Sequence, residues 1–575
     1  MKQALAVTVL VGSCVSGSVL AAQGSRDEIG HVHFPVSCTP AAQAQFDHAM
    51  ALLHSFVFPQ DVQAFAGVAT TDSSCGIAYW GVAISRRANP LVGPIDSVAL
   101  REGALAANQA RTIGAATARE RGYIAAIGEY YRDWPRRDHA ERVLAYTRAM
   151  RDLHQQYPDD AEAAVLYALS LDEAVTVEPA DPTFARQRDA ASILDTVLVA
   201  QPQHPGALHY LIHTYDFPSL ASRGIDAATR YTAAAPSASH ALHMPSHVYS
   251  MLGMWQESIA ANQAALAVAN AYAHAMDFMV YAYLQGAQDS AAHRLVAQSA
   301  ALQRTQTPDG NPTGAVLAGY TAVAAMPARY VLERGAWGEA AALEPRHTNR
   351  VADAMTYFVR AMGAARRGEM ARARLEIDTL ATLEHQVAAA QQAYWAEQVG
   401  IQRQAALAWL ALAEGRRGNA LRLMRAAADR EDASAKHVAM ENRLWPMREL
   451  LGELLLRIDQ PRAALTAFEA SLRVARNRYR AVYGAATAAR LAHDSTTARG
   501  YYQQLIALCS HRDVERPELA EARAFLSPTH APRRTRRARS GVFQSRTQGG
   551  GPDGAATGGP LRTAVSNVPP DGPER

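Results

Sequence analysis

Apolar residues recur at the three- and four-residue spacing of amphipathic helices between residues 38 and 526, and few stretches alternate as β-strands do. Residues 405–432 show this pattern clearly, because two amphipathic segments flank a turn rich in glycine and arginine at residues 415–418. The same unit of helix, short turn and helix recurs along the chain. The pattern therefore predicts an all-α fold of antiparallel helix pairs, which is a reason to look for a fixed sequence period.

The clearest repeat has a period of 34 residues. Residues 207–240 align with residues 241–274 at this offset, and residues 446–479 fit the same pattern. Within the second unit, the small residues Ser258 and Ala265 would let its two helices approach closely. Because a single helix pair cannot bury its apolar face alone, successive pairs should stack and leave a concave surface.

A helix–turn–helix period of this length is typical of tetratricopeptide repeats. The chain resembles the tetratricopeptide-repeat superfamily over most of residues 38–515. The strings HALHMPSHVYSMLGMW, DFMVYAYLQ and RELLGELLL make it similar to a group of exported bacterial repeat proteins of unassigned role. The resemblance implies a right-handed α-solenoid over residues 38–526, with a concave groove that binds a peptide, a protein or an envelope partner. Residues 88–157 and 286–350 do not fit the period, so the number of repeats stays open.

The N-terminus has the pattern of an export signal. Lys2 precedes a short apolar stretch, and small residues precede the expected cleavage point after Ala21. We interpret residues 1–21 as a cleaved signal peptide and residues 22–37 as an N-terminal segment, which makes the protein exported, either periplasmic or secreted. An alternative is a lipid anchor at Cys14. After the leader, no stretch approaches the roughly 20 apolar residues needed to cross a bilayer, so we expect no transmembrane segment.

The four cysteines point to one disulfide. They are Cys14, Cys38, Cys75 and Cys509. Cys38 and Cys75 flank one predicted helical hairpin, and a disulfide between them is expected in an oxidising compartment. Cys509 would then remain unpaired, and the cysteine spacing contains no zinc-finger pattern.

The net charge of +3 comes from the C-terminal tail. Residues 527–575 contain eight arginines and three acidic residues, so the rest of the chain is slightly acidic. Nothing in this composition indicates nucleic-acid binding. Because the tail is rich in glycine, proline and arginine, it cannot bury a core, and we expect it to be disordered.

The 34-residue register repeats a pair of histidines. His209 and His213 lie four residues apart on one predicted helix, and the equivalent positions one repeat later are His243 and His247. Stacked repeats place equivalent positions side by side. The four side chains are therefore expected to form a ladder across neighbouring helices.

The same register extends the ladder by one repeat. His240 corresponds to His274, and the positions equivalent to His243 and His247 become Asp277 and Tyr281. The resemblance to tetratricopeptide repeats implies that these positions face the concave groove. We therefore expect the histidine ladder to line the groove and not the core.

A ladder of imidazoles could bind zinc or copper, because both metals accept histidine nitrogens. Asp277 could add a ligand or orient a histidine, and Met251, expected near the same surface, would suit copper. The candidate metal ligands are His209, His213, His240, His243, His247, His274 and Asp277. Two alternatives remain open: the histidines recognise a partner without metal, or they are structural.

Other candidate chemistry is weak. The chain contains no phosphate-binding glycine loop, no serine nucleophile elbow and no His-Glu-x-x-His zinc motif, so an enzymatic reaction is not established. The N-terminal histidines share no repeated spacing, and we do not expect them to bind metal. They are His31, His33, His48 and His54.

Overall fold

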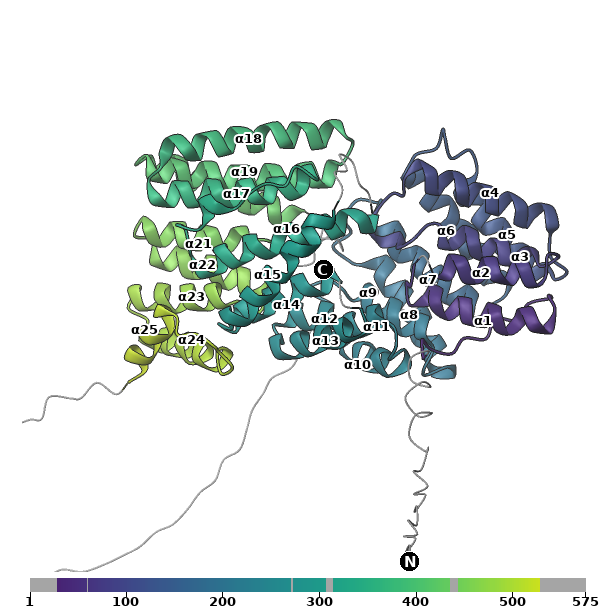
Figure 1. Cartoon of the computed structure of the whole chain (residues 1–575). Coiled ribbons are helices and arrows are strands. Elements are labelled where there is room, and N and C mark those ends of the chain that lie inside the picture. The colour runs from purple at the N-terminus through teal and green to yellow at the C-terminus, as the bar shows by residue number, and fades with distance from the viewer. Residues whose placement is uncertain (1–27, 59, 270–271, 307–313, 435–442, 528–575) are drawn as a thin grey trace, which may run out of the picture. The chain divides into compact units, whose positions relative to one another are not determined.

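The computed structural model describes residues 28–58, 60–269, 272–306, 314–434 and 443–527, and these residues form helices and connecting turns without a β-strand (Figure 1). The predicted all-α class is therefore confirmed. The interpreted signal peptide at residues 1–21, the alternative anchor at Cys14 and nearly all of the tail at residues 527–575 lie outside the described residues. None of the described helices is both long enough and apolar enough to cross a bilayer.

Helices follow one another with short connections along the whole described chain. The N-terminal helices are α1 (Pro40–His54), α2 (Gln60–Thr71), α3 (Gly76–Ser85), α4 (Ser97–Ile113), α5 (Ala118–Tyr131), α6 (His139–Gln156), α7 (Ala161–Val175) and α8 (Ala185–Ala200). The central helices are α9 (Pro205–Thr214), α10 (Ile225–Ala234), α11 (Ser239–His243), α12 (Pro245–Leu252), α13 (Trp255–Val268), α14 (Ala273–Gln285), α15 (Asp289–Thr305) and α16 (Gly314–Arg334). The C-terminal helices are α17 (Arg350–Arg367), α18 (Met370–Ala389), α19 (Ala393–Ala413), α20 (Arg417–Ala433), α21 (Met447–Arg457), α22 (Pro461–Val474), α23 (Tyr479–Leu491), α24 (Ser495–Leu508) and α25 (Pro517–Leu526). Short 3₁₀ turns are η1 (Pro90–Val92), η2 (Ala221–Gly224) and η3 (Ala340–Ala342).

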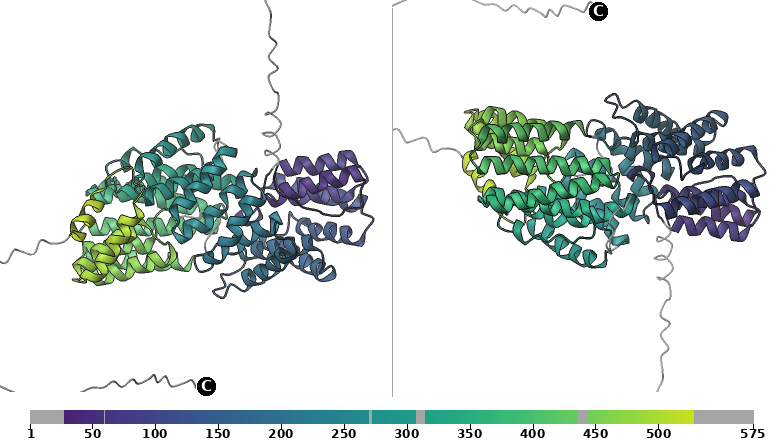
Figure 2. Two further views of the ribbon diagram at one scale, coloured as in Figure 1. Left: turned by 90° about the horizontal axis from the view of Figure 1, so that it is seen from below. Right: turned by 90° about the horizontal axis from the view of Figure 1, so that it is seen from above.

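Neighbours in sequence are neighbours in space. Most helices pack against the helix before and the helix after them, as the views in Figure 2 also show. The first helices of three successive pairs, α9, α11 and α14, begin at Pro205, Ser239 and Ala273, which is a spacing of 34 residues. The helix starts thus have the period of the sequence repeat.

A proline divides the first helix of the second pair. Helix α11 ends at His243, and α12 begins at Pro245 after a single intervening residue. Proline lacks a backbone N–H and cannot continue the hydrogen-bond ladder of a helix, so a new helix starts there. The break falls between His243 and His247, and these two histidines therefore lie on separate short helices.

The turn after α12 fits closely against a distant loop. Gly253 ends this helix with a φ of 69°, in the left-handed region that favours glycine. A Cβ atom at this position would lie 2.5 Å from the carbonyl oxygen of Arg476. Trp255 Nε1 donates to the carbonyl of Asn477 at 2.9 Å. The glycine therefore lets the α12–α13 turn contact the loop between α22 and α23.

Cys38 and Cys75 are joined by a disulfide with a Cα–Cα distance of 5.2 Å. Cys38 lies just before α1 and Cys75 just before α3, so the bond links the two ends of the first hairpin. Cys509, at the end of α24, is buried as a free thiol.

Candidate metal centre

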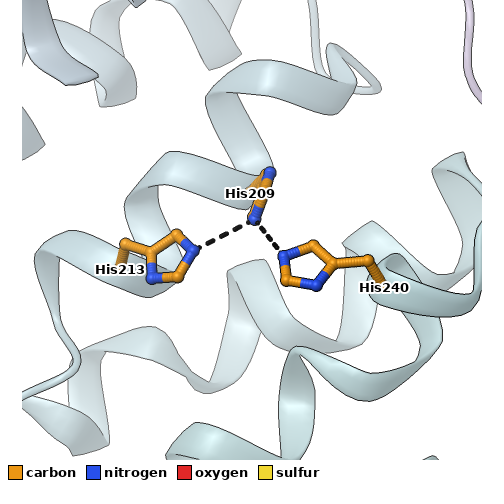
Figure 3. Close-up of side chains that lie close together, drawn as sticks. All are labelled: His209, His213 and His240. Atoms are coloured by element: carbon orange, nitrogen blue, oxygen red, sulfur yellow. Dashed lines mark hydrogen bonds between the residues drawn. The ribbon is translucent and has the colours of Figure 1, made fainter. Parts of the chain in front are cut away.

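Three histidine side chains converge between α9 and α11. His209 Nε2 lies 3.0 Å from His240 Nε2 and 3.1 Å from His213 Nε2. Figure 3 shows the rings of His213 and His240 pointing at the same nitrogen of His209. His209 and His213 are buried, and His240 is half-buried. We call these three residues the first triad.

The second ring nitrogens of His209 and His240 have partners of their own. His209 Nδ1 lies 2.6 Å from the backbone carbonyl of His54, which can only accept a hydrogen bond. His209 therefore donates from Nδ1, and its neutral ring carries a lone pair on Nε2. His240 Nδ1 lies 3.1 Å from the hydroxyl of Tyr272. Partners of this kind set the tautomer and the orientation of histidines that ligate metals.

A second triad consists of His243 on α11, His247 on α12 and His274 on α14. Its potential ligand atoms all lie within 4.8 Å of one another. His243 Nε2 and His247 Nε2 are 3.0 Å apart. The ring centroid of His274 is 4.8 Å from that of His243 and 5.7 Å from that of His247. His243 and His247 are buried, and His274 is half-buried.

The hydrogen bonds of the second triad turn two lone pairs toward each other. His243 Nδ1 lies 2.6 Å from Asn262 Oδ1, and the amide nitrogen of Asn262 donates to the Ser258 carbonyl, which leaves Oδ1 as an acceptor. His247 Nδ1 lies 3.1 Å from the carboxylate of Asp216. Both rings therefore donate from Nδ1, and as neutral imidazoles they carry lone pairs on the facing Nε2 atoms. Such a pair repels unless a cation, a proton or a metal ion, is shared between them.

Burial of the triad histidines disfavours protonation of their rings. It lowers the pKa of His209, His240 and His243 well below the usual 6.5, and neighbouring histidines lower it further. Neutral histidine is the form that ligates metals, since a protonated ring has no free lone pair. Burial thus favours the metal-binding form of His209, His240 and His243.

The nitrogen spacing suits a metal ion. With metal–nitrogen bonds of about 2.0–2.1 Å, two ligands at angles of roughly 90–110° are about 2.9–3.4 Å apart. The observed separations of 3.0 and 3.1 Å fall within that range.

Each triad has its own phenyl ring. The centroid of Phe56 lies 4.5, 6.0 and 5.6 Å from the rings of the first triad, and that of Phe278 lies 4.9, 5.0 and 5.1 Å from the rings of the second. Phe56 has a φ of 49°, which is uncommon for a residue with a side chain. An apolar covering of this kind limits the access of water to a metal.

A third group of ionisable side chains lies beside the first triad. Glu162, on α7, accepts from His54 Nε2 at 2.8 Å and from His204 Nε2 at 2.9 Å. His54 Nδ1 lies 3.0 Å from the Tyr210 hydroxyl, and His204 Nδ1 accepts from the backbone N–H of Ala207. Although burial opposes ionisation, the two histidines hold the pKa of Glu162 below its usual value. Every ring nitrogen here has a complementary partner, so this group is satisfied without a metal.

The sequence-based candidates divide into two sets. The six histidines of the predicted ladder form the two triads, whereas Asp277 accepts from Arg329 Nε at 2.9 Å and belongs to neither triad. Tyr281, the next position of the predicted ladder on α14, accepts from Arg478 at 2.7 Å. Arginines from distant segments therefore bind both Asp277 and Tyr281.

We expected the histidine ladder to be exposed in the groove and not buried in the core, and this was wrong for His209, His213, His243 and His247, which are all buried. Other groups of the protein cover them. Phe56 and the His54 carbonyl come from the end of α1, which packs on α9. The end of α1 thus covers the first triad, whereas Phe278 on α14 covers His243 and His247, and the local repeat contains no signal of the long-range contact with α1.

Several residues of the centre had no sequence signal. Asp216, Asn262, Tyr272 and Phe56 contact the triads, yet none of them belongs to a recognisable motif, and Phe278 lies in the string DFMVYAYLQ without having been expected at the site. His54 was not expected at a site, because its spacing to the other histidines is irregular. It lies 155 residues from His209 in the chain and is brought there by the packing of α1 on α9.

A buried carboxyl on α7 should make stability depend on pH. Asp172 accepts from Thr214 Oγ1 at 2.7 Å, and burial raises its pKa to about 8. The folded protein then keeps a proton that the unfolded chain releases near pH 4, so stability falls as pH rises from about 4 to about 8. Asp172→Asn removes this penalty. We expect its advantage in free energy of unfolding over the parent to grow by about 3.5 kcal/mol from pH 5 to pH 8.

Urea denaturation at the two pH values measures this difference. The matched control is Asp152→Asn, since the side chain of Asp152 is 64% exposed. It should show no such growth. An advantage of Asp172→Asn that is the same at both pH values would mean that Asp172 is ionised in the folded protein.

Comparison with known proteins assigns this chain to no family. No protein-family model matches the sequence, and no curated protein matches it either.

Proposed function

We propose that this protein binds metal ions in buried sites made of three histidines. The observation that carries the proposal is the pair of Nε2 atoms of His243 and His247, 3.0 Å apart, with both Nδ1 atoms engaged elsewhere. Two lone pairs at this distance need a cation. In the first triad, the Nε2 atoms of His213 and His240 both converge on the single lone pair of His209 Nε2.

The neighbouring group of His54, Glu162 and His204 is the internal comparison. There a carboxylate faces the two imidazoles, and each ring nitrogen has a hydrogen-bond partner of the opposite kind. At the centre of each triad the ring nitrogens face only further imidazoles, and in the second triad the two facing Nε2 atoms both carry lone pairs. A structural role explains the first arrangement fully, whereas metal binding explains the second better.

Zinc and copper are the candidate ions, because imidazole suits both. We further propose that the sites stand on a right-handed solenoid of tetratricopeptide-like repeats in an exported protein. The regular starts of α9, α11 and α14 support the repeat. The disulfide between Cys38 and Cys75 supports an oxidising compartment, where such bonds persist.

A second candidate function is a scaffold that binds a peptide, protein or envelope partner. A cavity of about 90 Å³ supports it, since its lining combines aromatic, acidic and basic side chains from α14, α20 and the segment before α21. These include Tyr281, Glu431 and Arg443. This function does not require a metal.

Metal analysis of the full chain, purified without an affinity tag, tests the first function. We expect copper or zinc in stoichiometric amount. His240→Ala removes a half-buried ligand of the first triad and should weaken metal binding at that triad at least about 100-fold. This is more than the effect of losing a residue that only hydrogen-bonds to a ligand and orients it.

The matched control is His293→Ala, because His293 is an exposed histidine on α15. It should bind as the parent does, and circular dichroism should show equal helix content in all three proteins. A parent that retains neither copper nor zinc after incubation and dialysis would contradict the proposal. So would a His240→Ala protein that binds as much metal as the parent.

A further inference from the structure

The two triads touch each other. The ring centroids of His213 and His247 are 6.0 Å apart, and those of His240 and His243 are 6.2 Å apart. His240 and His243 lie on one short helix, α11, and each belongs to a different triad. Ions held in both triads would therefore be close neighbours inside one cluster of six histidines.

Charges in one triad act on the other. The rings of His213 and His247, and those of His240 and His243, face each other across the two triads at distances that leave no room for a residue of opposite charge between them. A positive charge on one side thus disfavours a positive charge on the other. Two metal ions would repel across the same short distance.

Little negative charge is present to offset that repulsion. Asp216 is hydrogen-bonded to His247, and among the other nearby carboxylates Asp277 is paired with Arg329 and Glu162 with two histidines. All six candidate ligands are imidazoles, and a ligating imidazole brings no negative charge. Because Coulomb repulsion scales with the product of the charges, two divalent ions would repel four times as strongly as two monovalent ions at equal distance. The site therefore favours monovalent ions.

Copper(I) is the monovalent ion that suits these donors. It binds imidazole and soft sulfur ligands, whereas zinc sites with three protein ligands add a water as the fourth. Phe56 and Phe278 cover the two triads with apolar rings, which disfavours a water ligand. The thioether of Met251, one helical turn after His247, lines the adjacent cavity of about 90 Å³.

We propose that the two triads form a single dinuclear copper centre, with one copper(I) ion in each triad. The proposal rests on the metal-binding function proposed above. It adds the number of ions, their closeness and their identity.

Titration with copper(I) under anaerobic conditions, against a chromophoric copper(I) chelator, counts the ions. The parent should bind two per chain. His240→Ala, in the first triad, and His274→Ala, in the second, should each bind one. Both residues are half-buried, and His293→Ala is the control with two ions. Zinc(II) at tenfold excess should displace neither copper ion.

Electron paramagnetic resonance after chemical oxidation of the copper(I)-loaded protein, with its copper content measured again after oxidation, tests how close the two ions are. Two neighbouring copper(II) ions couple, so the parent should show less than half of the spins expected from its copper content, or a half-field transition. Each single variant should show the full signal of one isolated ion.

The outcomes separate the two proposals. Two ions with two full, isolated signals would overturn the dinuclear centre and leave metal binding intact. Displacement of copper by zinc would overturn the choice of copper. A parent that binds neither metal would overturn the metal-binding function itself. Retention of two ions by both single variants, with unchanged helix content, would show that the triads are not the sites.

Discussion

Replacing Glu162 with alanine should lower the free energy of unfolding by about 4 kcal/mol, the typical cost of breaking a buried ion pair or its equivalent. Glu162 is buried and accepts hydrogen bonds from both His54 and His204. Without the carboxylate, two buried imidazoles lose their acceptor. Urea denaturation monitored by circular dichroism measures the loss.

Glu162→Ala should also weaken metal binding at the first triad. The backbone carbonyl of His54 accepts from His209 Nδ1 and orients that ring. Gly206 makes room for His54, since a Cβ atom there would lie 2.3 Å from His54 Nδ1. If His54 shifts in Glu162→Ala, metal binding at the first triad should weaken by about tenfold. This is the lower end of the effect of losing a group that hydrogen-bonds to a metal ligand and orients it.

Two variants serve as controls. Glu162→Gln keeps one oxygen acceptor and the shape of the side chain, so it should lose only about half as much stability. Glu257→Ala changes an exposed glutamate on α13 and should stay within about 0.5 kcal/mol of the parent. Equal stability of Glu162→Ala and Glu257→Ala would contradict the role given to the buried group.

Replacing Arg478 with methionine should lower the free energy of unfolding by about 5 kcal/mol, the upper end for breaking a buried ion pair. Arg478 is fully buried and lies 2.8 Å from both Glu333 and Glu449. It also donates to the Tyr281 hydroxyl at 2.7 Å. Methionine fills the space but leaves two buried carboxylates without their cation.

The loss of unfolding free energy in Arg478→Met should depend on pH. Burial raises the pKa of Glu449, and Arg478 opposes that rise. Without the arginine, the folded pKa increases further, so the variant holds a proton that the unfolded chain releases above about pH 4.5. The destabilisation should therefore be smaller at pH 5 than at pH 7.5.

Denaturation of Arg478→Met at both pH values tests this expectation. Arg425→Met, at an exposed arginine on α20, is the matched control and should be nearly neutral. A loss below about 1 kcal/mol at pH 7.5, the range of an exposed salt bridge, would mean that the buried network contributes little.

The sequence by itself determined what depends on neighbouring residues. Amphipathic spacing predicted the helices, and Gly415 lies in the turn between α19 and α20 as the pattern indicated. The four-residue spacing of His209 and His213 places both on one face of α9, because an α-helix has 3.6 residues per turn. The 34-residue register likewise predicted that histidines of successive pairs lie near one another, and the equivalent residues His213 and His247 do so, with ring centroids 6.0 Å apart.

Only the tertiary structure decided how those histidines are used. The burial of the ladder, its division into two triads and the diversion of Asp277 and Tyr281 to Arg329 and Arg478 all depend on segments far away in the chain. The end of α1 covers His209, although His54 lies 155 residues before it. A helical period describes which side chains share a face. Whether that face meets solvent or another helix is settled by long-range packing, which no local pattern encodes.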